Sequence, residues 1–191
     1  MRILGIDPGT NRTGWGMILH EVSSDPIPNI KYIDHGCIIT EQIDVMPRRL
    51  FLLHEQLNQI IQNNLPDCLI IENIFFGRNA KTAISVSQAR GVIMLSAAKF
   101  ELPIFEYTPM TVKLSLTGSG RAEKKEVQEM VRKILNKQTK NLNLQFNGKK
   151  DKDFDDSADA LAIAIHHVIR DETKIVKPKK KKVKVVKKKK K

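Results

Sequence analysis

Residues 2–19 read RILGIDPGTNRTGWGMIL, and this stretch predicts how the fold begins. The apolar run 2–7 is typical of a buried strand, residues 8–12 carry the Pro, Gly and Asn of a turn, and residues 13–19 are typical of a returning strand. A third strand is predicted at 32–40. The chain is therefore expected to open with an antiparallel meander.

Beyond residue 47 the spacing of apolar residues changes to that of a helix. Leu50, Leu53, Leu57 and Ile61 recur at helical spacing, and Pro66 follows the pattern. Further helices are predicted at 80–100, 122–136 and 154–170, and further strands at 68–72 and 104–108. This alternation predicts an α/β fold, with a mixed sheet and helices on both faces.

The chain is long enough for one compact domain and ends in a strongly basic segment. Its 191 residues have 41% hydrophobic content, enough for one core. Of its 33 basic residues, 12 are lysines in 174–191, a segment without acids, so residues 1–173 carry 21 basic and 21 acidic residues. We predict a folded domain over 1–173 and a disordered, lysine-rich tail over 174–191 that adds sequence-independent attraction to phosphate.

Cysteine use and hydropathy indicate the compartment. Cys37 and Cys68 lie in apolar runs, which favours buried free thiols over a disulfide framework or a metal knuckle. No apolar stretch approaches the roughly 20 residues that span a bilayer, and the chain begins with a strand pattern instead of a signal peptide. The sequence predicts a cytoplasmic protein without a membrane partner.

Acidic residues close two of the predicted strands. Asp7 ends the first strand and Glu72 ends the strand at 68–72. The ends of central strands point into the crevice where α/β folds place ligands, although either acid could be an ordinary strand terminator in water. Carboxylates gathered in one pocket repel one another unless cations neutralise them, which indicates hard divalent metal ions with oxygen ligands.

Two further acids begin the last predicted helix. Asp156 and Asp159 are three residues apart, so they share one helix face. Asp156 alone could be a helix N-cap, and Asp155 competes for its place because it also lies one turn before Asp159. Asp159 lies in an apolar stretch where an unpaired carboxylate would be costly. With Asp7 as the bridge, these acids could hold two metal ions about 3.5–4 Å apart and cleave a phosphate ester.

Five motifs occur in an order and spacing that resemble a known family. They are GIDPG (5–9), IENIF (71–75), QARGV (88–92), FEY (105–107) and DSADALAIAI (156–165). Together they resemble the bacterial RuvC Holliday-junction resolvases. The polar link at 137–153 is longer than the family's usual link, and the lysine-rich tail has no dependable counterpart there.

The resemblance implies a ribonuclease H-like fold and a homodimer. It also implies a crossover junction endodeoxyribonuclease that nicks two opposing strands of four-way junction DNA during recombination and repair. Mg²⁺ is the implied cofactor, with two ions per active site and Mn²⁺ able to substitute. The implied partners are the RuvA and RuvB branch-migration proteins. By position, Asp7, Glu72, Asp156 and Asp159 match the family's catalytic, metal-binding acids.

Basic residues near a glycine turn are candidates for DNA contacts. Lys113, Arg121, Lys124 and Lys125 flank residues 118–120, just before a predicted helix, where free amides and lysines can hold phosphate. The alternative is a glycine turn beside a solvated helix face. The resemblance favours Lys113 and Lys124, which match basic positions near the family's site.

The segment after Glu72 offers a second kind of DNA contact. Phe75 lies three residues beyond this acid, and Arg78 follows shortly after. An aromatic ring there could stack on an unpaired base at the centre of a junction. The alternative is that Phe75 and its neighbour Phe76 belong to a core, as adjacent phenylalanines more often do.

Two other classes of function compete with a nuclease. The opening motif alone also resembles the phosphate-binding hairpin of sugar kinases and chaperone ATPases, but these enclose a nucleotide between two lobes and 1–173 supplies one. A non-catalytic DNA-binding module would explain the tail but not Asp159. Junction cleavage measured beside ATP hydrolysis separates the three.

Overall fold

The computed structural model describes residues 1–21, 28–73, 80–138 and 152–170. Its described strands form a five-stranded sheet in the order β3-β2-β1-β4-β5. The elements, in chain order, are β1 (Arg2–Asp7), β2 (Arg12–Glu21), β3 (Asn29–Ile39), α1 (Met46–Asn64), β4 (Cys68–Glu72), α2 (Ala80–Lys99), β5 (Ile104–Tyr107), α3 (Pro109–Thr117), α4 (Lys124–Gln138) and α5 (Lys152–Ile169).

The sheet is mixed, and its pairing defines the edge at which a site can form. β2 pairs antiparallel with both β1 and β3, which is the expected meander. β4 pairs in parallel with β1 and β5 in parallel with β4, and α1 and α2 lie in the crossovers that parallel strands require. The carboxyl ends of β1, β4 and β5 therefore lie at one edge, called here the carboxyl edge of the sheet.

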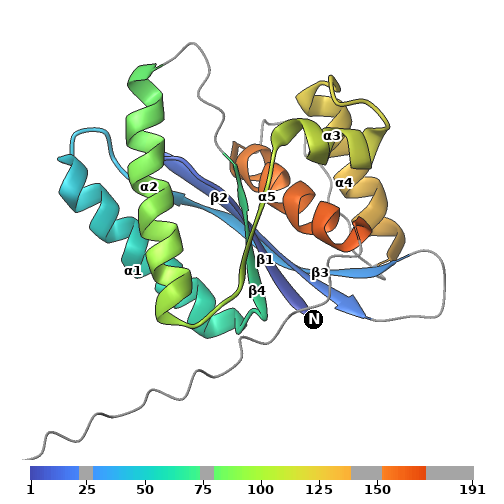
Figure 1. Cartoon of the computed structure of the whole chain (residues 1–191), viewed down its shortest axis with the longest axis horizontal. Coiled ribbons are helices and arrows are strands. Elements are labelled where there is room, and N and C mark those ends of the chain that lie inside the picture. Colours follow the sequence, from blue (N-terminus) through green and yellow to red (C-terminus); the bar gives the residue numbers. More distant parts are fainter. Residues whose placement is uncertain (22–27, 74–79, 139–151, 171–191) are drawn as a thin grey trace, which may run out of the picture.

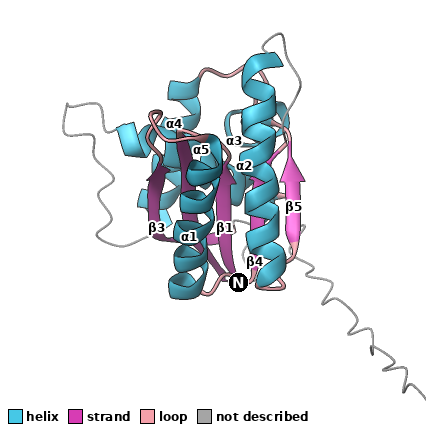
Figure 2. Ribbon diagram, turned by 90° about the vertical axis from the view of Figure 1, so that its left-hand side faces the viewer, coloured by secondary structure: helices cyan, strands magenta, loops and turns pink. Residues whose placement is uncertain are grey.

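Helices cover both faces of the sheet, as the sequence predicted. α1 and α2 pack on one face and α3, α4 and α5 on the other (Figure 1 and Figure 2). Alternate residues of β1 serve the two cores, because side chains of a strand point to opposite faces. Leu4 and Ile6 are buried against α1 and α2, whereas Ile3 is buried on the α5 side.

Glycines let α5 lie directly on β1 and β2. A Cβ on Gly5 would lie 2.0 Å from the backbone oxygen of Ala160, and one on Gly14 would lie 2.1 Å from that of Asp156. Gly14 is the Cα partner of Asp7 in the β1–β2 pair. The start of α5, with its acids, is thereby brought against the end of β1.

Most predicted elements are confirmed with end shifts of a few residues, but α3 was missed. Its sequence, PMTVKLSLT, shows no clear apolar stripe. Local signals explain why it forms: Thr108 caps its first turn by accepting from the Thr111 amide, and Pro109 fits the first helical position. Gly118 ends the helix with a φ of 79°, a conformation that suits glycine. None of the described helices is long and apolar enough to cross a membrane.

Candidate active site

The two strand-borne acids lie side by side on the α5 face of the sheet. Asp7 ends β1 and Glu72 ends β4, and the parallel register pairs Ile6 with Ile71, the residue before each acid. Since side chains alternate along a strand, both carboxyl groups leave the sheet on the side of Ile3 and Ile70, which belong to the α5 core. Their position at the carboxyl edge agrees with the sequence analysis.

Burial and mutual repulsion change the acidity of this pair. Burial, together with the charge of Glu72, raises the pKa of Asp7 well above its ordinary value of 3.8. Burial also raises the pKa of Glu72, assisted by Asp159, while a hydrogen bond from Asp7 partly opposes the rise. The pair therefore favours a shared proton or another bound cation, as closely spaced carboxylates do.

The start of α5 supplies the other two acids, and Asp155 and Asp156 have different neighbours there. Asp159 acts electrostatically on both Asp7 and Glu72, and burial raises the pKa of Asp159 itself. The Asp156 backbone packs on Gly14 of β2, beside Asp7. Asp155 instead accepts a 3.0 Å hydrogen bond from Gln128 Nε2 of α4. The geometry thus favours Asp156 over Asp155 as the partner of Asp159.

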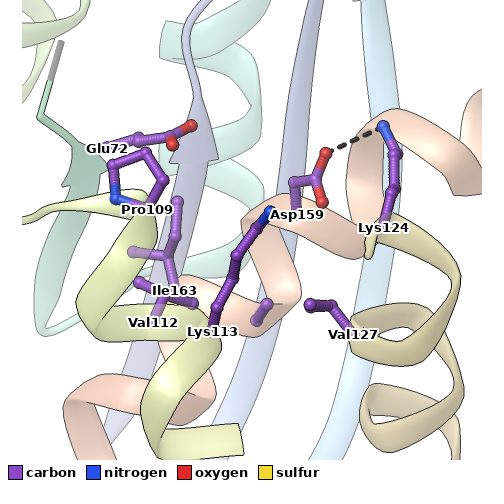
Figure 3. Close-up of a pocket in the computed structure, with 9 residues that line it drawn as sticks. Glu72, Pro109, Val112, Lys113, Lys124, Val127, Asp159 and Ile163 are labelled. Atoms are coloured by element: carbon purple, nitrogen blue, oxygen red, sulfur yellow. Dashed lines mark ion pairs between the residues drawn. The ribbon is translucent and has the colours of Figure 1, made fainter. Parts of the chain in front are cut away.

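Two lysines border the acids, as the sequence analysis expected. Lys124 Nζ lies 2.8 Å from Asp159 Oδ2, and Figure 3 shows this ion pair between the start of α4 and α5. Lys113 extends from α3 toward Asp159 (Figure 3). Its positive charge partly opposes the rise in the pKa of both Glu72 and Asp159. With Glu72 and Asp159, both lysines line a pocket of about 170 Å³ between α3, α4 and α5.

The remaining predicted DNA contacts differ in position. Arg121 and Lys125 are exposed near the start of α4, consistent with either a phosphate contact or a solvated face. Phe75 and Arg78 lie outside the described residues, as do most of 137–153 and the tail 174–191. Their proposed roles stay predictions.

Two arginines that the sequence analysis did not single out support the acids. Arg90 of α2 donates to the Glu72 carbonyl oxygen at 2.5 Å, and its other terminal nitrogen lies 2.5 Å from Glu106 Oε2. It therefore fixes the end of β4 to β5. Arg12, the first residue of β2, forms an ion pair with Asp156. Arg90 lies within the QARGV motif, but nothing local in the sequence marks Arg12.

The donor set suits a hard divalent cation, although the side chains do not form a finished cage. Carboxylates from three elements, β1, β4 and α5, lie at this edge of the sheet, and Mg²⁺ prefers such oxygen donors. Among the residues that the structure describes, no three His, Cys, Asp or Glu side chains are grouped to hold one ion. At α5, Asp156 pairs with Arg12 and Asp159 with Lys124. Metal binding there would exchange these cations for the ion.

Comparison with known proteins agrees with this geometry. The family model described as "Crossover junction endodeoxyribonuclease RuvC" matches residues 3–167. The RuvC of Syntrophomonas wolfei is 44% identical over 88% of this chain and 88% of its own length, and that of Desulfitobacterium hafniense is 44% identical over 87% and 92%. Thermus thermophilus RuvC, solved in complex with a Holliday junction substrate, superposes with a TM-score of 0.74 at 28% identity, covering 89% of this chain and 94% of that one.

The fold is therefore of the ribonuclease H-like class, with acids gathered at the carboxyl edge of its sheet. Within this class, the chain belongs to the RuvC family of crossover junction endodeoxyribonucleases.

Proposed function

We propose that this chain is a structure-specific endonuclease that resolves four-way DNA junctions by metal-dependent hydrolysis of phosphodiester bonds. The observation that carries the proposal is the convergence of Asp7, Glu72, Asp156 and Asp159 from β1, β4 and α5 on one edge of a RuvC-family fold. A chain that bound DNA without cutting it would have no use for buried acids at the place where phosphate approaches.

The four acids are the proposed metal ligands, with Mg²⁺ as the ion and Mn²⁺ able to substitute. Held by these acids, such ions would supply the positive charge that activates a water molecule and stabilises the leaving oxygen of the broken ester. Asp7 is the central ligand of the proposed site, because the charges of both Glu72 and Asp159 act on its carboxyl group. Its burial strengthens electrostatic attraction to a cation.

Lys113 and Lys124 are proposed to hold the scissile strand. Both line the pocket with Glu72 and Asp159, so a phosphate held by these lysines would lie next to the acids. Arg121 and Lys125 are proposed to extend this phosphate contact along α4, and Phe75 and Arg78 to contact the junction centre. Such backbone contacts position the substrate, whereas the branch point must be recognised by shape.

Cleavage of two opposing strands requires two active sites, and we propose that a homodimer supplies them. α2 exposes an apolar stripe at helical spacing that includes Ile84, Met94 and Leu95, with Ile84 69% and Leu95 63% exposed. At Gly91, in the same stripe, an added Cβ would have no atom within 4 Å apart from those of its chain neighbours and the adjacent backbone of α2. A second copy of α2 could pack closely there, burying apolar surface that a monomer leaves in water.

Residues 1–173 are proposed to form the nuclease domain, and 174–191 to add unspecific attraction to DNA. The segment holds 12 lysines and no acid. RuvA and RuvB are the proposed protein partners in branch migration, on the strength of the family alone.

The test is cleavage of a synthetic four-way junction with Mg²⁺ and with EDTA, beside a linear duplex of the same sequence and an ATP hydrolysis assay. We expect paired nicks in the junction when Mg²⁺ is present and none when EDTA is present. We expect no ATP turnover. Asp7→Asn should abolish nicking and preserve junction binding, because it removes a metal ligand and a negative charge near phosphate. Wild-type nicking by this variant would overturn the site, and ATP turnover without nicking would overturn the function.

A further inference from the structure

Arg12 forms a contact across the fold that the proposed function does not use. Its Nε pairs with Oδ2 of Asp156, although the two residues are 144 positions apart in the chain. The side chains are 31% and 27% exposed, so the pair is partly shielded from water. Arg12 thus occupies one of the four carboxylates that the metal site needs.

The backbone that carries Arg12 is firmly held. Arg49 of α1, which is 9% exposed, donates to the Asn11 side chain and, at 3.1 Å, to Thr40 Oγ1. The Thr40 amide donates back to the Asn11 carbonyl oxygen at 3.0 Å. The β1–β2 turn is therefore braced against α1 and β3, and the Arg12 side chain extends from a fixed point.

The charged groups of the site make three close contacts, and Lys113 is a further cation that acts on Glu72 and Asp159. Asp7 and Glu72 are hydrogen-bonded to each other, Asp159 pairs with Lys124, and Asp156 pairs with Arg12. The two cations come from different elements, Lys124 from α4 and Arg12 from β2, so they draw the two α5 carboxylates toward different neighbours.

We propose that Arg12 is a tethered counter-ion of Asp156, which a divalent cation must displace in order to bind. Arg12 is then a positioning residue: it holds the Asp156 carboxylate at the site and lowers metal affinity by competing for it. The inference rests on the proposed function, because it takes Asp156 as a metal ligand.

The alternative is that the pair merely fastens β2 to α5. A plain fastening contact would lose stability on substitution whether or not metal is present, and would leave metal affinity unchanged. A competing counter-ion has the opposite signature. Its removal weakens the fold in EDTA but strengthens metal binding, because a positive charge no longer repels the ion.

The proposal is tested by calorimetric titration of Mn²⁺ into the full chain without DNA, which measures affinity independently of cleavage. Arg12→Gln should bind Mn²⁺ about three- to tenfold more tightly than wild type, as expected for one like charge removed near a partly exposed, salt-screened site. Arg12→Lys, which keeps the charge, should stay within about twofold of wild type. Thermal unfolding should show Arg12→Gln less stable than wild type in EDTA, and more strongly stabilised by Mn²⁺.

Two controls make the result specific. Lys31 Nζ lies 2.8 Å from Glu21 Oε2, at the end of the β2–β3 pair that is far from Arg12. Lys31→Gln therefore removes one positive charge away from the site and should not change Mn²⁺ affinity. Adding Arg12→Gln to Asp156→Asn should give no gain over Asp156→Asn alone. An equal gain in that background, or unchanged or weaker binding by Arg12→Gln, would overturn the proposal. If wild type nicks junctions and binds Mn²⁺ but Arg12→Gln does not change Mn²⁺ affinity, this inference alone fails. If wild type neither nicks junctions nor binds Mn²⁺, the proposed function is overturned as well.

Discussion

Gly14→Ala should displace the α5 acids from the strand acids. The added Cβ would lie 2.1 Å from the backbone oxygen of Asp156 and 2.6 Å from its carbonyl carbon, whereas ordinary contact begins near 3.4 Å. The atoms in the way belong to the backbone and cannot rotate aside. α5 must therefore retreat from β2 by about 1.3 Å, the difference between 3.4 and 2.1 Å.

The expected magnitudes follow from this displacement. Overpacking of a core typically costs about 1–3 kcal/mol of unfolding free energy, and the backbone clash places Gly14→Ala near the upper value. A loss of about 3 kcal/mol lowers the melting temperature of a domain of this size by roughly 6–12 °C. A misplacement of about 1 Å at a catalytic group can reduce the rate by about 100-fold.

The assay is thermal unfolding together with junction cleavage, and Gly36→Ala is the matched control. A Cβ on Gly36 would lie 2.9–3.0 Å from the Trp15 ring, which is a side chain, and Gly36 does not lie under α5. We expect Gly36→Ala to cost some stability but to keep the cleavage rate within a fewfold of wild type at a temperature where both are folded. Equal losses of activity in the two variants, or a fully active Gly14→Ala, would refute the reasoning.

Further predictions concern pH, assembly and the basic segment. The folded-state pKa values of Asp7, Glu72 and Asp159 are raised, so the stability that their protonation contributes in EDTA is present below their ordinary values of 3.8–4.5 and is lost as pH rises through the raised values. Urea unfolding across this range should show that loss, and Asp7→Asn should reduce it; an unchanged slope would contradict the assignment. Leu95→Glu on α2 should turn the proposed dimer into a monomer in sedimentation equilibrium and abolish paired nicking. Lys133→Glu, at an exposed position of α4, is the control, and the same loss in this variant would refute the choice of surface. Truncation after residue 173 should weaken binding to junction and duplex alike and flatten its salt dependence, because lysines release counterions from any phosphate backbone. Loss of junction preference would show that the segment recognises shape.

Local patterns in the sequence were sufficient for every described element except α3, and for proposing most of the candidate site. Strand and helix periodicity predicted the meander, the crossovers and the helices on both faces, because these patterns reflect which side chains each element must bury. Asp7 and Glu72 could be placed at one edge since each closes an apolar run, and parallel strands bring their carboxyl ends together. The spacing of Asp156 and Asp159 likewise fixed their shared helix face.

What the tertiary structure decided depends on contacts between residues far apart in the chain. α3 was missed because a short helix without an apolar stripe is stabilised by its caps and by packing, and its formation is what carries Lys113 to Glu72. The choice of Asp156 over Asp155 rests on Gln128 of α4, and the role of Arg12 on an ion pair that closes only when α5 docks on β2. Sequence periodicity reports which face of an element is buried, but it contains no information about which charged side chains meet once separate elements pack, and the electrostatics of this site are set by those meetings.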